Sequence, residues 1–296
     1  MSSFENKKAL KFVITLGNDP TNPRTFGNSN NNQIIIQGLR ATINIDKAGG
    51  MMMGTLRARV YGVSQADMNS ITTLQYQPNY MIKNIIQVYA IDGIMETLVF
   101  AGDIVNAWGD YLNMPDVFLQ IQAMSAFFSG LQSVPPLSVK GGISVPTAMS
   151  QIAQKMGLTF ENNNVTTTLS NIYLPNTLKE QALTLARAAN CWLYIDDTTL
   201  AITNKYSARQ GGIPNISAQS GLVGYPTFDG IGVNFRTLFN PAISFGGMVQ
   251  LTTDIKRAAG QWIVTSISHD LESEKPGGRW ISSIRGNTNG NPNLAS

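Results

Sequence analysis

The chain has 296 residues, enough for two or three domains, and only 13% of them are charged, about half the share usual in soluble domains. Its net charge of +3 comes from 21 basic and 18 acidic residues, too weak and too dispersed to predict stable nucleic-acid binding. The single cysteine excludes an intrachain disulfide, and no apolar run is long enough for membrane insertion. So low a charge content favours a surface largely covered by neighbouring subunits, because interface cores are depleted of charge.

The first 130 residues predict β-strands separated by turns. The expected elements are strands at 9–16, 33–36, 39–45, 56–63, 85–91, 97–108 and 117–126, with a short helix at 65–74. A polar loop covers residues 17–32, and a glycine-rich turn carries three methionines: Met51, Met52 and Met53. The N-terminus has no apolar segment of the secretory kind, so assembly is expected in a cytoplasm.

The pattern changes near residue 130, where a proline-rich stretch at 133–137 marks a domain boundary. A helix is expected at 144–157, with Pro146 in its first turn and Gly157 at its end. The further expected elements are a strand at 158–160, a second helix at 177–190 and a hairpin of strands 192–195 and 199–202. Residues 131–204 therefore predict a small α/β domain.

From residue 205 the chain returns to β-structure. Strands are expected at 233–238, 248–253, 261–270 and 279–285, and a flexible polar tail at 287–296. Shifting the first β region by 163 residues places 86–88 on 249–251, 99–104 on 262–267 and 117–118 on 280–281. The strand spacing is kept without a gap, which favours two copies of one β-fold.

His269, the only histidine, is followed by Asp270, a pairing that suggests a catalytic triad. Neighbours on a strand point to opposite faces, so Asp270 is badly placed to orient His269, and a hydrogen-bonded strand histidine is the favoured interpretation. Cys191 lies in an apolar strand and is expected to be a buried, inert thiol. Asp196 and Asp197 are expected in a hairpin turn, where aspartate suits the backbone.

The sequence predicts no catalytic residue, no cofactor site and no metal site. The glycine-rich turn at 49–55 lacks the lysine of a phosphate-binding loop, and a strand follows where a helix is needed. One histidine and one cysteine leave no transition-metal ligand spacing. The chain is therefore predicted to be a β-rich structural subunit and not an enzyme.

The middle of the chain resembles the small α/β module of phage tail hub proteins. The resemblance rests on the helix, strand, helix and hairpin pattern of 144–202, and extends to the flanking stretches 220–226, 235–241 and 268–273. Together these resemble baseplate hub subunits of contractile-tailed bacteriophages, relatives of the T-even tail hub and of the base of type VI secretion spikes.

This resemblance implies a β-rich α+β fold with two related, tube-forming β-barrel domains and a small inserted α/β domain. The corresponding boundaries are 1–130, 131–204 and 205–286, followed by the tail 287–296. It implies a homotrimeric, pseudo-hexameric ring that adapts a six-fold tail tube to a three-fold spike and surrounds the DNA channel. It carries no catalytic residues over to this chain.

The implied partners are the chain itself, a tail tube or tube-initiator protein above and a spike protein below. Tape measure and wedge proteins are further candidates, and the implied location is the virion's tail baseplate. Head-to-tail rings join different patches of one chain. The candidate interface residues are Met51, Met52, Met53, Phe239, Asn240 and Pro241. The alternatives are a receptor- or carbohydrate-binding tail component and a tail-associated cell-wall hydrolase.

Overall fold

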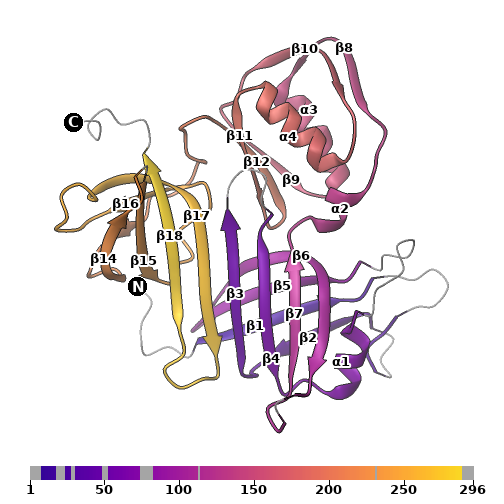
Figure 1. The fold of residues 1–296 in the computed structure, drawn as a ribbon, viewed down its shortest axis with the longest axis vertical. Helices are drawn as coiled ribbons and strands as arrows, with labels where there is room; N and C mark the ends of the chain where they lie inside the picture. Colours follow the sequence, from indigo (N-terminus) through magenta and orange to yellow (C-terminus); the bar gives the residue numbers. More distant parts are fainter. Residues whose placement is uncertain are drawn as a thin grey trace.

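A computed structural model describes residues 8–17, 24–27, 31–48, 53–73, 83–112, 114–230 and 232–288. One long sheet runs through the molecule, and a smaller α/β unit lies above it in Figure 1. No helix among the described residues is long and apolar enough to cross a membrane. Met51 and Met52, part of the loop 17–32 and most of the tail 287–296 lie outside the described residues.

Eleven strands follow one another across the long sheet in the order β14-β15-β18-β17-β3-β4-β7-β6-β5-β1-β2, while β16 pairs with β17 and β13 with β16. The N-terminal strands are β1 (Lys8–Thr15), β2 (Gln33–Gln37), β3 (Ala41–Ala48), β4 (Thr55–Tyr61), β5 (Ile85–Asp92), β6 (Met95–Asp110) and β7 (Phe118–Met124). The C-terminal strands are β13 (Asn215–Ile216), β14 (Leu222–Phe228), β15 (Gly232–Leu238), β16 (Met248–Leu251), β17 (Gly260–Ser273) and β18 (Trp280–Thr288).

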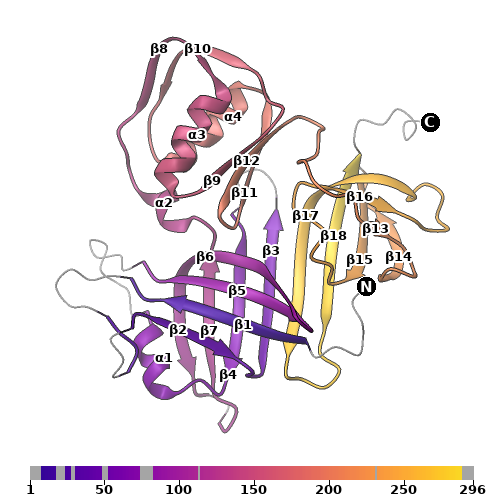
Figure 2. The same ribbon diagram turned by 180° about the vertical axis from the view of Figure 1, so that it is seen from behind.

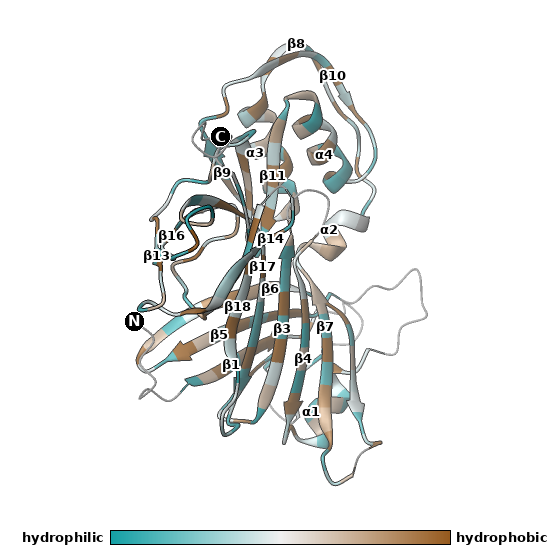
Figure 3. Ribbon diagram, turned by 60° about the vertical axis from the view of Figure 1, so that its left-hand side comes forward, coloured by the Kyte–Doolittle hydropathy of each residue, from teal (hydrophilic) through white to brown (hydrophobic). Residues whose placement is uncertain are grey.

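Alternating side chains make one face of each strand apolar. In β4, Leu56, Ala58 and Val60 are buried while Arg57 and Arg59 are exposed, so both arginines lie on one face as predicted. Figure 3 shows the same alternation of brown and teal along β3, β4 and β7. The buried faces meet in a single apolar core between crossing layers, which Figure 2 shows from behind, with β5 and β1 across the other strands.

The strand β6 joins the two layers because it is long enough to belong to both. Its residues Met95–Asp103 pair with β5, and its residues Asp103–Asp110 pair with β7. Gly102 lies where the layers approach most closely, and a Cβ atom there would be 2.7 Å from the carbonyl oxygen of Met124. Only glycine therefore allows this crossing without a shift of the backbone.

We expect Gly102→Ala to lower the free energy of unfolding by about 1–3 kcal/mol, because the added methyl group must displace backbone. Gly142→Ala is the matched control, since its Cβ would find its nearest neighbour at 3.7 Å, and its effect should stay within about 0.5 kcal/mol. Denaturant unfolding of both variants checks this. Equal effects would show that the crossing at Gly102 is not tight.

The α/β unit contains α3 (Val145–Met156) and α4 (Leu178–Ala188), close to the predicted bounds. Ser144 caps α3 by accepting from Thr147 N, and Gly157 ends it with a φ of 74°. Thr177 caps α4 by accepting from Glu180 N at 3.4 Å. Three strands lie beside them, with β12 parallel to β9 and antiparallel to β11: β9 (Thr159–Asn163), β11 (Cys191–Asp196) and β12 (Thr199–Asn204). The helices and strands share an apolar core of their own.

Several elements were not predicted from the sequence. The additional strands are β8 (Leu137–Ser144), β10 (Thr168–Leu174) and β14, and α2 (Phe127–Leu131) is an additional short helix beside α1 (Gln65–Ile71). The strand β8 contains two glycines and buries no side chain fully, and β10 has a bulge after Ser170. Weak burial leaves little alternation in the sequence, which is why the pattern missed these strands.

The two β regions repeat one order of strands. Strands β3-β4-β7-β6-β5 and β14-β15-β18-β17-β16 lie side by side in the same order along the chain and across the sheet. Each middle strand has a bulge, and just before it Ile104 N donates to Asn84 O at 2.8 Å, as Val264 N donates to Gly247 O at 2.9 Å. Ile104 thus corresponds to Val264, three residues before the Ile267 that the 163-residue shift assigns to it. The predicted alignment was wrong in this strand alone of the three it compared.

Candidate assembly site

His269 lies in the interior and does not face Asp270. Its Nδ1 atom is 2.8 Å from the hydroxyl of Ser282, and its ring packs against Phe239 with centroids 5.4 Å apart. Asp270 points to the opposite face and accepts from Asn44 at 3.0 Å. Burial, with Lys47 nearby, lowers the pKa of His269 to about 3. The prediction of a hydrogen-bonded strand histidine is confirmed.

Cys191 is buried, as predicted, and burial raises the pKa of its thiol. A thiol that is buried and protonated is a poor nucleophile. Among the described residues, no group of three or more metal-ligating side chains comes together.

Phe239, Asn240 and Pro241 line a pocket of about 190 Å³ together with Lys47, at the end of β3. Phe239 is buried against Trp280 and His269, and Pro241 is exposed. Met53 is also buried, and its methyl group lies against Gly130. These candidate interface residues thus have contacts within their own chain, and their contact with a neighbouring subunit stays a prediction.

A cluster of buried charges joins the long sheet to the α/β unit. Lys47 of β3 binds Asp196 at 2.8 Å and also Asp197, in the turn between β11 and β12. Arg209, after β12, binds Asp196 at 2.8 Å and Glu161 of β9 at 2.7 Å. We call these five side chains the junction cluster. Asp197 also accepts from the backbone N–H of Ala101 in β6 at 3.0 Å, so the turn is tied to two strands of the first β region.

The charges in the junction cluster hold one another ionised. Burial opposes ionisation of Asp196, but Lys47 and Arg209 together hold its pKa below its usual value. Burial, opposed by Lys47 and aided by Asp196, raises the pKa of Asp197 to about 6. The hydrogen bond from Arg209 lowers the pKa of Glu161. The two aspartates do lie in the predicted turn, where Asp197 has a φ of 52°, but the sequence did not reveal their ion pairs.

The exposed face of the long sheet is polar across both β regions. Amide, hydroxyl and guanidinium groups pair along it, including Arg59 with Gln120 at 3.2 Å and Asn106 with Gln122 at 3.3 Å. On β18, Arg285 binds Asp229 at 2.6 Å. A groove of about 620 Å³ on the second β region continues this face and is lined by Ser266, Ser268, Ser283, Asn234 and Arg236.

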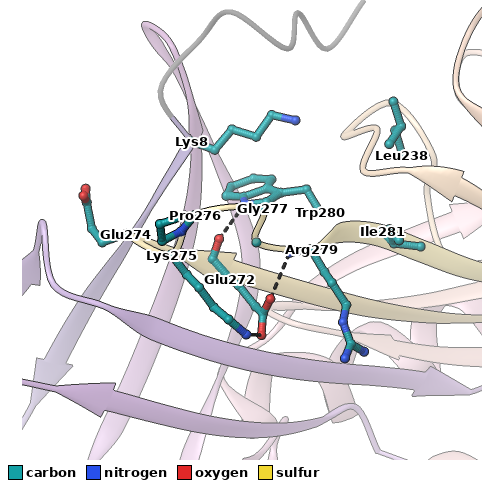
Figure 4. A pocket seen from close by; sticks show the side chains of 11 residues that line it. Lys8, Leu238, Glu272, Glu274, Lys275, Pro276, Gly277, Arg279, Trp280 and Ile281 are labelled. Carbon is teal, nitrogen blue, oxygen red and sulfur yellow. Dashed lines mark hydrogen bonds and ion pairs between the residues drawn. The ribbon is translucent and has the colours of Figure 1, made fainter.

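At the end of the sheet away from the α/β unit, the turn between β17 and β18 is held by Glu272. Its carboxylate binds Lys275 at 2.7 Å and accepts from Arg279 N at 3.0 Å, and its carbonyl oxygen accepts from the Trp280 indole at 2.8 Å (Figure 4). An open pocket of about 740 Å³ beside this turn is lined by charged side chains and Trp280. The turn is therefore a fixed, charged end of the sheet.

Comparison with known proteins identifies the family. The family model described as baseplate hub gp41 matches residues 23–277. The chain belongs to this baseplate hub family. The resemblance to baseplate hub subunits, inferred from the middle and flanking stretches, is thereby confirmed. No curated protein sequence matches the chain.

Solved tail proteins share the hub fold. The 43 kDa tail protein of prophage MuSo2 from Shewanella oneidensis has a TM-score of 0.63 at 11% identity, covering 94% of this chain and 97% of its own. The tail protein from Neisseria meningitidis MC58 has the same TM-score and identity, covering 95% and 97%. The E. coli c3393 protein, a type VI secretion component, has a TM-score of 0.56 at 7% identity, covering 84% and 73%. At these identities the likeness shows the fold alone.

Proposed function

We propose that three copies of this hub subunit close into a ring in the tail baseplate of a phage virion. The ring adapts a six-fold tail tube above to a three-fold spike below and surrounds the channel that DNA crosses. One observation carries the proposal: a single chain holds two five-stranded units of identical strand order side by side in one sheet. Three such chains present six similar units, while every other part of the chain occurs three times.

We infer the same division into domains: a first β-barrel at 1–130, an inserted α/β domain at 131–204 and a second β-barrel at 205–286. The separate apolar cores of the three parts support it. The first core also includes Phe239, Leu271 and Trp280, so the two barrels share side chains at their contact. The tail tube or tube-initiator protein and the spike protein are the proposed partners.

The polar face of the sheet suits the wall of a DNA channel. Its arginines contact neighbouring side chains, as Arg285 does with Asp229 and Arg59 with Gln120. An arginine that is already paired gains less from a phosphate, so the wall passes DNA without holding it. We infer weak, salt-sensitive contact with nucleic acid and no stable complex.

Mass determination of the purified hub assembly should give three copies of this chain in each ring. Cryo-electron microscopy of the same particle should superpose the two five-stranded units of one chain within a ring of six. Six copies of the chain, or two units that occupy unrelated positions, would contradict the proposed function.

A further inference from the structure

The edge of β17 that lies away from β18 is fully occupied within the chain. It pairs first with β16, then Val264 bonds to Gly246 and Gly247, and then residues Ser266–Ser273 pair with β3. Because β6 corresponds to β17, the matching edge of β6 should need the same three neighbours. It has β5 and Asn84 in the first two positions. In the third position, no strand of the described chain pairs with it.

One residue covers this open part of β6. The N–H of Ala107 donates to the hydroxyl of Thr73 at 2.8 Å, and Thr73 N donates to Ala107 O at 2.9 Å. Ala107 corresponds to Ile267, which in β17 pairs with Lys47 of β3. Thr73, just after α1, therefore takes the place that a whole strand takes in the second β region.

The counterpart of β3 is β14, and β14 is the other open end of the sheet. Among the described residues it pairs only with β15. In Figure 1 it lies to the left, and the first β region lies to the right. Both open edges carry exposed apolar side chains. On β14 these are Val223, Tyr225 and Phe228, and at the end of β6 they are Trp108, Tyr111 and Leu112. Open edges with apolar side chains are the usual sites of strand addition.

We propose that β14 of a second copy pairs antiparallel with residues 106–110 of β6, in the position that β3 takes beside β17, and displaces Thr73. The second copy is the occupant because its β14 repeats the strand that already fills this position within the chain. The contact rests on the proposed ring: repeated around three chains, it makes the junction between subunits equivalent to the junction within each subunit.

The repeat also gives the register. Asn44 and Thr227 are equivalent, because Asn44 pairs with Arg57, Thr227 pairs with Asn234, and the latter two occupy matching places beside β7 and β18. Within the chain Asp270 pairs with Asn44. The corresponding pair between chains is Asp110 with Thr227, followed by Gly109 with Phe228 and Trp108 with Asp229.

A disulfide trap tests this register. Ala107 bonds toward the open side, so by alternation Asp110 and Thr227 form a pair without mutual backbone bonds, with Cα atoms about 4.5 Å apart. That separation suits a disulfide. The full-length Asp110→Cys, Thr227→Cys variant, oxidised over a concentration series, should give covalent oligomers ending at three chains. Cys191 is buried and stays outside the reaction.

The matched control is Asn106→Cys with Thr227→Cys, which keeps the same exposed face but lies four residues out of register. It should give at least about tenfold less crosslinked product, because four residues along a strand are about 13 Å. Equal crosslinking in both variants, or none in either up to millimolar protein, would overturn the proposal. If native mass spectrometry finds a three-chain ring in which Asp110→Cys, Thr227→Cys does not crosslink, this contact is wrong while the proposed function stands.

Thr73 provides a second, independent measurement. Thr73→Val removes the hydroxyl that satisfies Ala107 N and should lower the concentration for half-association on the order of five- to tenfold, because β14 then displaces a weaker contact. Thr72→Val is the control, since the hydroxyl of Thr72 bonds to Met68 O within α1 and not to β6. Its association should stay unchanged. Weaker association of Thr73→Val would show that Thr73 is part of the contact rather than its cover.

Discussion

Lys47→Met is expected to lower the free energy of unfolding by about 3–5 kcal/mol. The lysine side chain is only 10% exposed and binds both Asp196 and Asp197, which are themselves nearly buried. Methionine fills a similar volume but leaves two neighbouring carboxylates without their shared cation. Arg209 reaches Asp196 alone, so the charge of Asp197 has no other counter-ion within the junction cluster.

Chemical denaturation at pH 7 measures the loss. Lys11→Met is the matched control, because Lys11 forms an ion pair of similar length, 2.7 Å to Glu96, at a more exposed site; its loss should be at most about 1 kcal/mol. Adding Asp197→Asn to Lys47→Met should recover part of the stability, since it removes the unpaired charge. Equal losses for Lys47→Met and Lys11→Met would show that the junction cluster contributes no more than a surface ion pair.

His269 should make the fold sensitive to acid. Its pKa in the folded chain is lowered to about 3, while an exposed histidine takes up its proton near 6.5. Below that pH the unfolded chain binds a proton that the folded chain excludes. The stability that this residue contributes is therefore complete above about pH 6.5 and falls by about 1.4 kcal/mol per pH unit as the pH drops toward 3.

The measurement compares the native chain with His269→Gln from pH 7 to pH 4. The native chain should lose roughly 3 kcal/mol relative to the variant over this range. The comparison is needed because Asp197, with its pKa raised to about 6, acts in the opposite direction. Its folded form takes up a proton before its unfolded form does, so acidification from pH 6 to 4 stabilises the fold through this group. Parallel curves for the two proteins would contradict the assignment of His269.

Local patterns predicted much of this fold because their causes are local. The caps at Ser144 and Thr177 and the end of α3 at Gly157 depend on residues within one turn of helix. The opposite orientations of His269 and Asp270 follow from strand geometry alone. Cys191 was placed correctly because its strand neighbours are apolar.

The junction cluster could not be predicted in the same way, because Lys47 lies some 150 residues from Asp196 and Asp197 in the chain. A turn aspartate that is exposed and one that binds a distant lysine have the same local sequence. The register of β6 against β17 failed for another reason. Both strands carry runs of adjacent buried residues, 99–101 and 262–264, and such runs match equally well at more than one offset.

The pairing of β17 with β3 has a mechanical consequence. Eight residues of each strand pair side by side, from Ser266 with Ala48 to Ser273 with Ala41. A pull along these strands loads all the interstrand hydrogen bonds of this seam together in shear, whereas a pull across them would open the bonds one after another. The two β regions of the chain therefore transmit a force along the strand direction as a single stiff plate, without a hinge between them.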